Sequence, residues 1–410
     1  MSLEISQGTP VEISEERALT DSRRQMVLNM GPQHPSTHGV LRVILTMEGE
    51  TIVGCDPVLG YLHRGVEKLG ETHRYSQFVP WTDRTDYVAA PSNNLGYILA
   101  VERLCGIEAP ERATYWRMIM GELARLASHL VWLGTHALDI GALSMSLYCF
   151  RERELILDIF ETFCGARLTT NMMEMGGFSR PIPDNLPGMV RDFCNIFPEK
   201  QVEYESLLSA NPIWLSRTRG VGVIEPDAAI SMSLTGACLR GSGINYDVRK
   251  ATPYLYYDRM DFEVPLGTRG DVYDRYLVRM EEMRQSISII EQCLDQMPTD
   301  GPLSLTESPY VIPPHDSVMK TAEDMQRHFI WVIKGFSPPK GEVYQAIEHS
   351  KGELGYYVVS DGTPIPYRVR LRTPDFVNLQ SLPYMAQGAA LADVVALIGT
   401  IDIVLGSVDR

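Results

Sequence analysis

A nine-residue segment near the N-terminus, from Gly31 to Gly39, gathers side chains that could carry chemistry. It reads Gly-Pro-Gln-His-Pro-Ser-Thr-His-Gly and holds two of the nine histidines of the chain. The spacing of His34 and His38 is that of a metal-binding pair on a helix, but Pro35 between them is incompatible with a regular helix. Short apolar runs flank the segment, so the pattern predicts a tight loop between two strands with His38 at its rim. A structural turn and a functional loop both fit this pattern.

Three further side chains have types that suit acid–base or electrostatic roles. Asp139 follows Thr-His-Ala-Leu in apolar surroundings, where a carboxylate needs a partner; it could also be the N-cap of the next helix. Tyr87 ends the segment Thr-Asp-Arg-Thr-Asp-Tyr and, by itself, is typical of an aromatic residue beside a helix with its hydroxyl at the surface. Arg64, in His-Arg-Gly, is by itself typical of a solvated loop charge.

The cysteines exclude the common metal sites. The chain has seven, and the closest pair, Cys149 and Cys164, is fifteen residues apart. No Cys-x-x-Cys occurs, which removes the usual zinc and iron–sulfur spacings and predicts no metal bound by this chain. An odd number of widely spaced cysteines is typical of reduced, buried thiols rather than of a disulfide framework.

Charge and hydropathy exclude further classes of function. The formal net charge of −15 argues against nucleic acid as a partner, because phosphate binding needs clustered Lys and Arg. Residues 1–24 are polar and rich in acids, so we expect a poorly ordered arm and no signal peptide. The apolar stretch 389–406 contains Asp393 and Asp402, which favours a buried helix over a membrane span. Any membrane association must then come through partners.

The elements that must position these residues can be predicted from periodicity. Strands are expected over residues 40–47 and 51–58, around a Glu-Gly-Glu turn, and again over 342–347, 354–359 and 367–371. Helical spacing covers 86–105, 111–134, 142–164 and a helix from Asp271 to before Pro298, and a helix from about Gly388 closes the chain. The fold class predicted is α+β, with β-rich ends around a central helical body.

Five regions follow from these patterns. We expect an N-terminal arm over 1–24, a β-rich region with the histidine loop over 25–75, and a central helical bundle over 76–300. A Pro- and Ser-rich connection over 301–340 leads to a C-terminal β region with its closing helix over 341–410.

The histidine loop also resembles a family signature. GPQHPSTHGVLR, at residues 31–42, is similar to the signature of the quinone-binding subunit of respiratory complex I, which is related to the large subunit of nickel–iron hydrogenases. Further blocks of the resemblance follow in order over nearly the whole chain: GYLHRGVEK (60–68), DRTDY (83–87), ELARLASHL (122–130), THALDIGAL (135–143), FRERE (150–154), RGVGVI (219–224), GINYDVRK (243–250), FEVPLGTRGDVYDR (262–275), PPKGEVY (338–344), KGELGYYVVSDG (351–362), FVNLQSLPY (376–384) and GSVDR (406–410).

The resemblance implies a hydrogenase large-subunit-like fold without the metal centre. Hydrogenases hold nickel and iron with two Cys-x-x-Cys pairs, because soft thiolates suit these metals. The corresponding positions here are Thr82–Tyr87 and Asp402–Ser407, and neither segment contains cysteine. In the family, the emptied cavity receives the quinone headgroup.

The resemblance also assigns roles to residues around that cavity. Tyr87 and His38 would donate hydrogen bonds to the quinone carbonyl oxygens, as reduction by two electrons and two protons requires. Asp139 would bond and orient His38. Thr135 and Val404 would line the pocket.

On the electron-donor side, the resemblance places Arg64 beside the terminal [4Fe–4S] cluster of the neighbouring subunit. Thr169 falls where the family often has histidine, within Gly-Ala-Arg-Leu-Thr, and Glu174 stands where an arginine is common. These two departures leave the quinone residues unchanged and bear on the electrostatics near the cluster.

The implied protein is a peripheral subunit on the cytoplasmic side of a bacterial membrane, in a proton-pumping NADH–quinone oxidoreductase. Its expected partners are the cluster-bearing B subunit, the C and I subunits, the H subunit of the membrane arm, and either ubiquinone or menaquinone. Two alternatives stay open: the same role in an oxidoreductase fed by ferredoxin or another donor, and a non-catalytic scaffold. Joint presence of His38, Tyr87 and Asp139 argues against the scaffold.

Overall fold

The N-terminal sheet is built from three antiparallel strands in the order β1-β2-β3. The computed structural model describes residues 25–410, so the arm expected over residues 1–24 lies outside the described residues. Side chains alternate in burial along β2, where Val43, Leu45 and Met47 face the core. The predicted hairpin is confirmed. The strands are β1 (Gln25–Met30), β2 (Arg42–Glu48) and β3 (Thr51–Val58).

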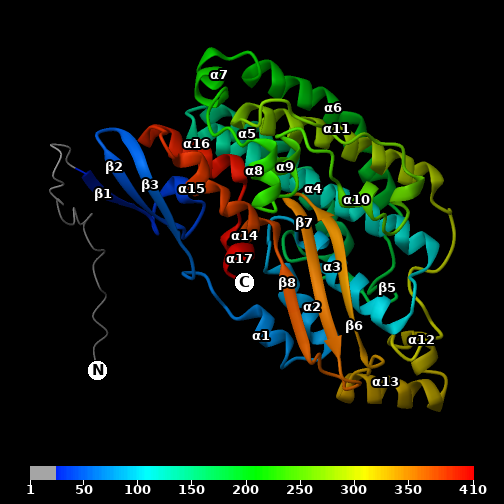
Figure 1. Cartoon of the computed structure of the whole chain (residues 1–410). Helices are drawn as coiled ribbons and strands as arrows, with labels where there is room; N and C mark the ends of the chain where they lie inside the picture. Colours follow the sequence, from blue (N-terminus) through cyan, green and yellow to red (C-terminus); the bar gives the residue numbers. More distant parts are fainter. Residues whose placement is uncertain (1–24) are drawn as a thin grey trace, which may run out of the picture.

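Long helices form the body of the molecule, and α4 lies at its centre (Figure 1). Every residue from Ala113 to Leu130 is buried, because α3, α5, α11 and α16 surround α4 on all sides. The sequence predicted one broad apolar face, and the structure adds buried, paired charges on the other faces. The helices are α1 (Val66–Gly70), α2 (Tyr75–Asp83), α3 (Ala90–Cys105), α4 (Glu111–Asp139), α5 (Leu143–Cys164), α6 (Leu186–Leu208) and α11 (Val272–Gln296).

Two predicted helix boundaries were wrong for identifiable reasons. Helix α3 begins at Ala90 rather than Asp86, because the Asp86 carboxylate accepts the N–H of Val88 and fixes a turn before the helix. Helix α4 continues past Gly134 to Asp139. Gly134 is a packing glycine: a Cβ there would lie 3.3 Å from the Cα of Ser146, so its absence lets α4 and α5 approach closely.

The connection expected over residues 301–340 contains a helix that the sequence did not predict. Helix α13 carries apolar residues such as Phe329 and Ile333, yet none of its residues is buried. The shorter elements of the middle of the chain are β4 (Met173–Glu174), β5 (Gly177–Phe178), α7 (Pro212–Thr218), α8 (Pro226–Ser231), α9 (Ala237–Arg240), α10 (Val248–Ala251), α12 (His315–Val318) and α13 (Ala322–Lys334).

The C-terminal region returns the chain to the middle of the molecule. The three predicted strands are confirmed as an antiparallel sheet in the order β6-β7-β8, which packs against α3. Figure 1 shows the following helices between the two three-stranded sheets, with the C-terminus beside them. The elements are β6 (Gly341–His349), β7 (Gly352–Ser360), β8 (Arg368–Arg372), α14 (Pro374–Leu379), α15 (Ser381–Ala386), α16 (Leu391–Ile401) and α17 (Leu405–Asp409).

The predicted α+β class is therefore confirmed: small sheets stand at both ends of a helical body. The closing helix predicted from Gly388 is α16, but it is preceded by two short helices and followed by α17. All seven cysteines are free; six are buried, as expected, and Cys164 is half-buried. No helix within residues 25–410 has both the length and the hydrophobicity needed to cross a membrane.

Candidate functional site

The histidine loop presents His38 at its end. The loop is fixed from within, because the N–H of Ser36 donates to Nδ1 of His34 at 3.2 Å and the hydroxyl of Thr37 donates to the carbonyl of His34 at 2.8 Å. A short 3-10 turn over Pro35–Thr37 then leaves His38 with φ 50° and ψ 39°. His34 is thus used to cap this turn, and the loop is a fixed platform for His38.

His38 lies against Asp139. Its Nε2 is 3.4 Å from a carboxylate oxygen of Asp139, and both side chains are 13% exposed. The contact lacks hydrogen-bond geometry, so Nε2 makes no hydrogen bond within the described residues. The alternative role of Asp139 as the N-cap of the next helix was wrong, because Asp139 ends α4 and Ala142 occupies the N-cap of α5.

Helix α16 brings the C-terminal segment to this pair. The 3-10 turn of the histidine loop packs against α16, and so does the last part of α4. The indole N–H of Trp132 donates to the carbonyl of Gly399 at 2.9 Å, and a Cβ at Gly399 would collide with the ring of His136. A glycine is therefore required where the two helices cross. Thr135 lies one turn before Asp139 on α4 and is half-buried, with its hydroxyl donating to the carbonyl of Val131.

Residues 82–87 and 402–407 lie side by side. Arg64 joins them, since one guanidinium N–H group donates to the carbonyl of Arg84 at 2.8 Å and another to that of Gly406 at 2.7 Å. A Cβ at Gly406 would lie 2.8 Å from the carbonyl oxygen of Thr85, so the backbones are almost in contact. Burial lowers the pKa of Arg64 from that of a free guanidinium.

A buried salt bridge behind these segments was missed by the sequence reasoning. The ammonium of Lys351 lies 2.9 Å from a carboxylate oxygen of Asp86 and 3.9 Å from one of Asp402, and it donates to the hydroxyl of Ser128 at 3.0 Å. Burial alone would lower the pKa of Lys351, but the acids Asp402, Asp86 and Asp375 more than offset this and raise it. Lys351 is thus a fully charged cation inside the molecule.

The pKa values of the acids in this salt bridge are shifted in opposite directions. Burial tends to raise the pKa of Asp86, but Lys351 and His349 lower it below its usual value. Burial raises the pKa of Asp402, and one of its carboxylate oxygens has no hydrogen-bond partner among the described residues. The sequence held one sign of this salt bridge: a lysine and acids in otherwise apolar segments, where charged groups need partners. From the sequence, Asp402 was used only as an argument against a membrane span.

Asp375 fixes the start of α17. Its two carboxylate oxygens accept the N–H of Val404 at 2.8 Å and the hydroxyl of Ser407 at 2.6 Å. Burial raises the pKa of Asp375 to about 7. Val404 itself is 8% exposed at the N-cap of α17. The role of Asp375 was also missed from the sequence. Its partners lie about thirty residues later in the chain, too far away for a local sequence motif to link them.

Tyr87 and Thr169 complete the set predicted from the sequence. Tyr87 adjoins the buried Asp86, is 39% exposed and makes no hydrogen bond through its phenol within the described residues. Burial and the nearby Asp86 raise the pKa of Tyr87, so its hydroxyl keeps its proton at neutral pH. Thr169 is half-buried after α5, and within the described residues it makes no hydrogen bond with the other predicted residues. Nearby, the N–H of Asn171 donates to Asp83 at 3.0 Å.

The arrangement offers hydrogen-bond donors and charges rather than metal ligands. Within residues 25–410, no three His, Cys, Asp or Glu side chains come together as a metal site. Within residues 25–410, the imidazole of His38 and the phenol of Tyr87 make no hydrogen bond with a protein acceptor. Arg64 is a cation held by two backbone carbonyl groups. Such groups can stabilise negative charge that develops on an oxygen atom and can deliver protons to it.

Comparison with known proteins identifies the family of this chain. The family model for the 49 Kd subunit of respiratory-chain NADH dehydrogenase matches residues 139–410. The NADH-quinone oxidoreductase D subunit of Geotalea uraniireducens is 54% identical over 385 residues, covering 94% of this chain and 98% of the relative. That of Geobacter sulfurreducens is 52% identical, covering 94% and 98%. The second D subunit of Chloroflexus aurantiacus is 50% identical over 408 residues, covering 99% of each chain. This chain therefore belongs to the family of the 49 Kd subunit of respiratory-chain NADH dehydrogenase.

Proposed function

We propose that this chain forms the quinone headgroup pocket of a proton-pumping NADH–quinone oxidoreductase. The observation that carries the proposal is the close approach of residues 82–87 and 402–407, joined by Arg64 and without a thiolate in either segment. A pocket that binds metal in hydrogenases would here be lined by donors suited to a quinone. The names of the relatives, which specify NADH and quinone, support this activity.

In this proposal, Tyr87 and His38 bind the two carbonyl oxygens of the quinone. Both are positioned donors whose hydrogen bonds strengthen as the oxygens gain negative charge, so they favour the reduced state. Asp139 holds the His38 ring and stabilises it when protonated, at a distance of 3.4 Å. Thr135 and Val404 shape the walls of the pocket. Quinone is the substrate, and the chain itself supplies protons and orientation.

Electrons would reach the quinone from the terminal [4Fe–4S] cluster of the adjacent subunit, which supplies the redox chemistry. The guanidinium of Arg64 would face that cluster, since a cation there stabilises the more negative, reduced form. Thr169 would lie on the same side. We also propose that the fold is related to that of the hydrogenase large subunit. Residues 82–87 and 402–407 would then stand in the places of its two cysteine-bearing segments.

As a member of complex I, the chain has other complex I subunits as partners. We assign contacts to the cluster-bearing B subunit, to the C and I subunits, and to the H subunit of the membrane arm. The chain would then sit peripherally on the cytoplasmic side of the membrane, with lipid contact made by its partners. The net charge of −15 is consistent with protein partners and not with nucleic acid.

The experiment that tests the proposal is Tyr87→Phe in the assembled complex. Loss of one preorganised donor should lower the rate of quinone reduction by about 10²–10³-fold, while electron transfer from NADH to an artificial acceptor upstream stays unchanged. Tyr384→Phe is a matched control, because Tyr384 is 46% exposed and also lacks a hydrogen bond within the described residues. Equal quinone turnover in Tyr87→Phe and in the control would reject the proposal.

A further inference from the structure

The loop over residues 59–64, between β3 and α1, has no regular secondary structure and carries Arg64 at its end. It is held by Asp409, almost 350 residues later in the chain. The N–H of Gly60 donates to one carboxylate oxygen of Asp409 at 2.9 Å, and the N–H of Leu62 donates to the other at 2.7 Å. Asp409 is 8% exposed, so both bonds are shielded from water.

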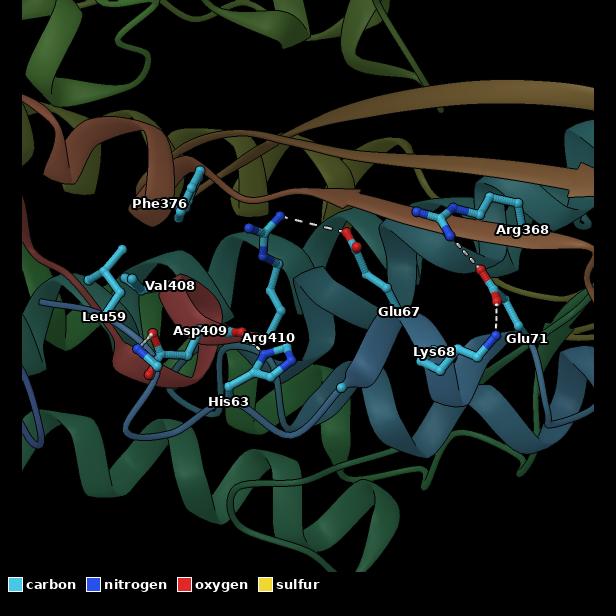
Figure 2. Close-up of a pocket in the computed structure, with 12 residues that line it drawn as sticks. Leu59, His63, Glu67, Lys68, Glu71, Arg368, Phe376, Val408, Asp409 and Arg410 are labelled. Carbon is cyan, nitrogen blue, oxygen red and sulfur yellow. Dashed lines mark hydrogen bonds and ion pairs between the residues drawn. The ribbon is translucent and has the colours of Figure 1, made fainter.

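The backbone of the C-terminal residues continues this contact. Nδ1 of His63 donates to the carbonyl of Asp409 at 2.6 Å, and the N–H of Arg64 donates to the carbonyl of Arg410 at 3.0 Å. Figure 2 shows His63, Asp409 and Arg410 together on one wall of a surface pocket. Four successive polar contacts thus fix the loop from Gly60 to Arg64.

The side chain of Arg410 is itself held by other parts of the chain. The guanidinium of Arg410 donates to the carbonyl of Leu371 at 3.0 Å, lies 3.6 Å from Glu67 and stacks 4.5 Å from the ring of Phe376. Figure 2 shows its side chain directed toward Glu67. Arg410 is therefore anchored on β8, α14 and α1, all of which lie outside the 59–64 loop.

Helix α17 connects the contacts of Asp409 and Arg410 to Val404, which lies on the proposed quinone side of the site. Its N-cap, Val404, is held by Asp375, and its last residue is Asp409. Between them, the carbonyl of Gly406 accepts a hydrogen bond from the Arg64 side chain. One short helix thus fixes both the backbone and the side chain of Arg64.

We infer that Asp409 is a positioning residue that sets the orientation of Arg64 toward the terminal cluster. This inference rests on the proposed function, which places Arg64 beside that cluster. A carboxylate that accepts two alternate N–H groups fixes loop geometry in a way that a single acceptor cannot. Asparagine at this position would keep one acceptor and present an N–H₂ group to the second donor.

The test is a redox titration of the terminal cluster in the assembled complex, followed by electron paramagnetic resonance. Loss of the Asp409 charge alone would raise the cluster potential, whereas misplacement of Arg64 would lower it. We expect Asp409→Asn and the charge-retaining Asp409→Glu to shift the potential downward, in the direction of Arg64→Met. In the Arg64→Met background, neither substitution should produce a further downward shift.

Glu71→Gln is the matched control. Its carboxylate lines the same pocket, and its polar contacts are with Lys68 and Arg368, not with Asp409 or Arg410. The substitution removes an equal charge without releasing the 59–64 loop, so the potential should stay constant or rise. Hydrogen exchange of residues 59–64 should increase in Asp409→Asn and not in Glu71→Gln.

The outcomes distinguish a failure of this inference from a failure of the proposed function on which it rests. A potential that rises in Asp409→Asn and is unchanged in Asp409→Glu, or amide exchange over 59–64 that does not increase, would overturn the positioning role. A cluster unaffected by Arg64→Met would instead overturn the placement of Arg64, and the inference with it.

Discussion

The contact between His38 and Asp139 makes a quantitative prediction. At 3.4 Å, Coulomb's law with an effective dielectric constant of about 20 gives about 5 kcal/mol for a protonated imidazole beside a carboxylate. Both side chains are 13% exposed, and removing them from water offsets much of this energy. We therefore expect a coupling energy of about 1–3 kcal/mol, the upper part of the range of about 0.5–3 kcal/mol found for residues in direct contact.

The assay is a double-mutant cycle on kcat/KM for quinone in the assembled complex. His38→Ala and Asp139→Asn should each slow quinone reduction, and the double mutant should be little worse than the poorer single mutant. A coupling of that size corresponds to a deviation of about 5- to 150-fold from additivity. Electron transfer from NADH to an upstream acceptor normalises each preparation to the amount of active complex.

Asp56→Asn provides the control cycle, since Asp56 is exposed on β3 and has no contact with His38. Its effect should add to that of His38→Ala within about 0.3–0.5 kcal/mol. If His38→Ala and Asp139→Asn were additive within the same margin, the two residues would act independently, and the orienting role of Asp139 would be refuted.

Three further predictions address other parts of the site. Val404→Met adds bulk at the pocket wall and should weaken quinone-site inhibitors by about 1–3 kcal/mol; unchanged inhibition constants would place Val404 outside the pocket. Threonine cannot gain a proton when the cluster is reduced, so the cluster potential should be flat between about pH 6 and 8 and approach about 59 mV per pH unit in Thr169→His. A flat potential in both would show that position 169 is remote from the cluster. Burial raises the pKa of Asp83 to about 7, above about 3.9 in an unfolded chain, so the folded state binds the extra proton. The free energy of unfolding of the wild type, relative to that of Asp83→Asn, should therefore fall by about 1.4 kcal/mol per pH unit from about pH 4 to 7 and then level off. A difference in the free energy of unfolding that does not depend on pH in denaturant titrations would contradict this.

Local patterns were enough to predict most of the elements and part of the site. Alternating burial on β2 and the helical spacing of α5 and α11 are set by near neighbours in the sequence, so their boundaries were predicted within a few residues. The loop that carries His38 was predicted from its prolines and glycines. Gly134 led to a wrong helix end because a glycine can end a helix or let another helix approach it, and only packing distinguishes the two.

The rest of the site depends on contacts between distant segments. Lys351, Asp86 and Asp402 lie far apart in the sequence and meet only when β7, α3 and α16 are assembled. The same is true of Asp409 and the loop at Gly60. Helix α13 was missed because it follows a stretch rich in Pro and Ser, and the composition of the whole connection outweighed its local periodicity.

The central claim is that the quinone headgroup binds beside residues 82–87 and 402–407. The most direct measurement is a structure of the assembled complex with a short-chain quinone bound under turnover-blocked conditions. We predict that one carbonyl oxygen of the headgroup lies within hydrogen-bond distance, about 2.7–3.2 Å, of the Tyr87 hydroxyl and the other within that distance of Nδ1 of His38, because Nε2 faces Asp139. A headgroup bound away from both residues would contradict the account.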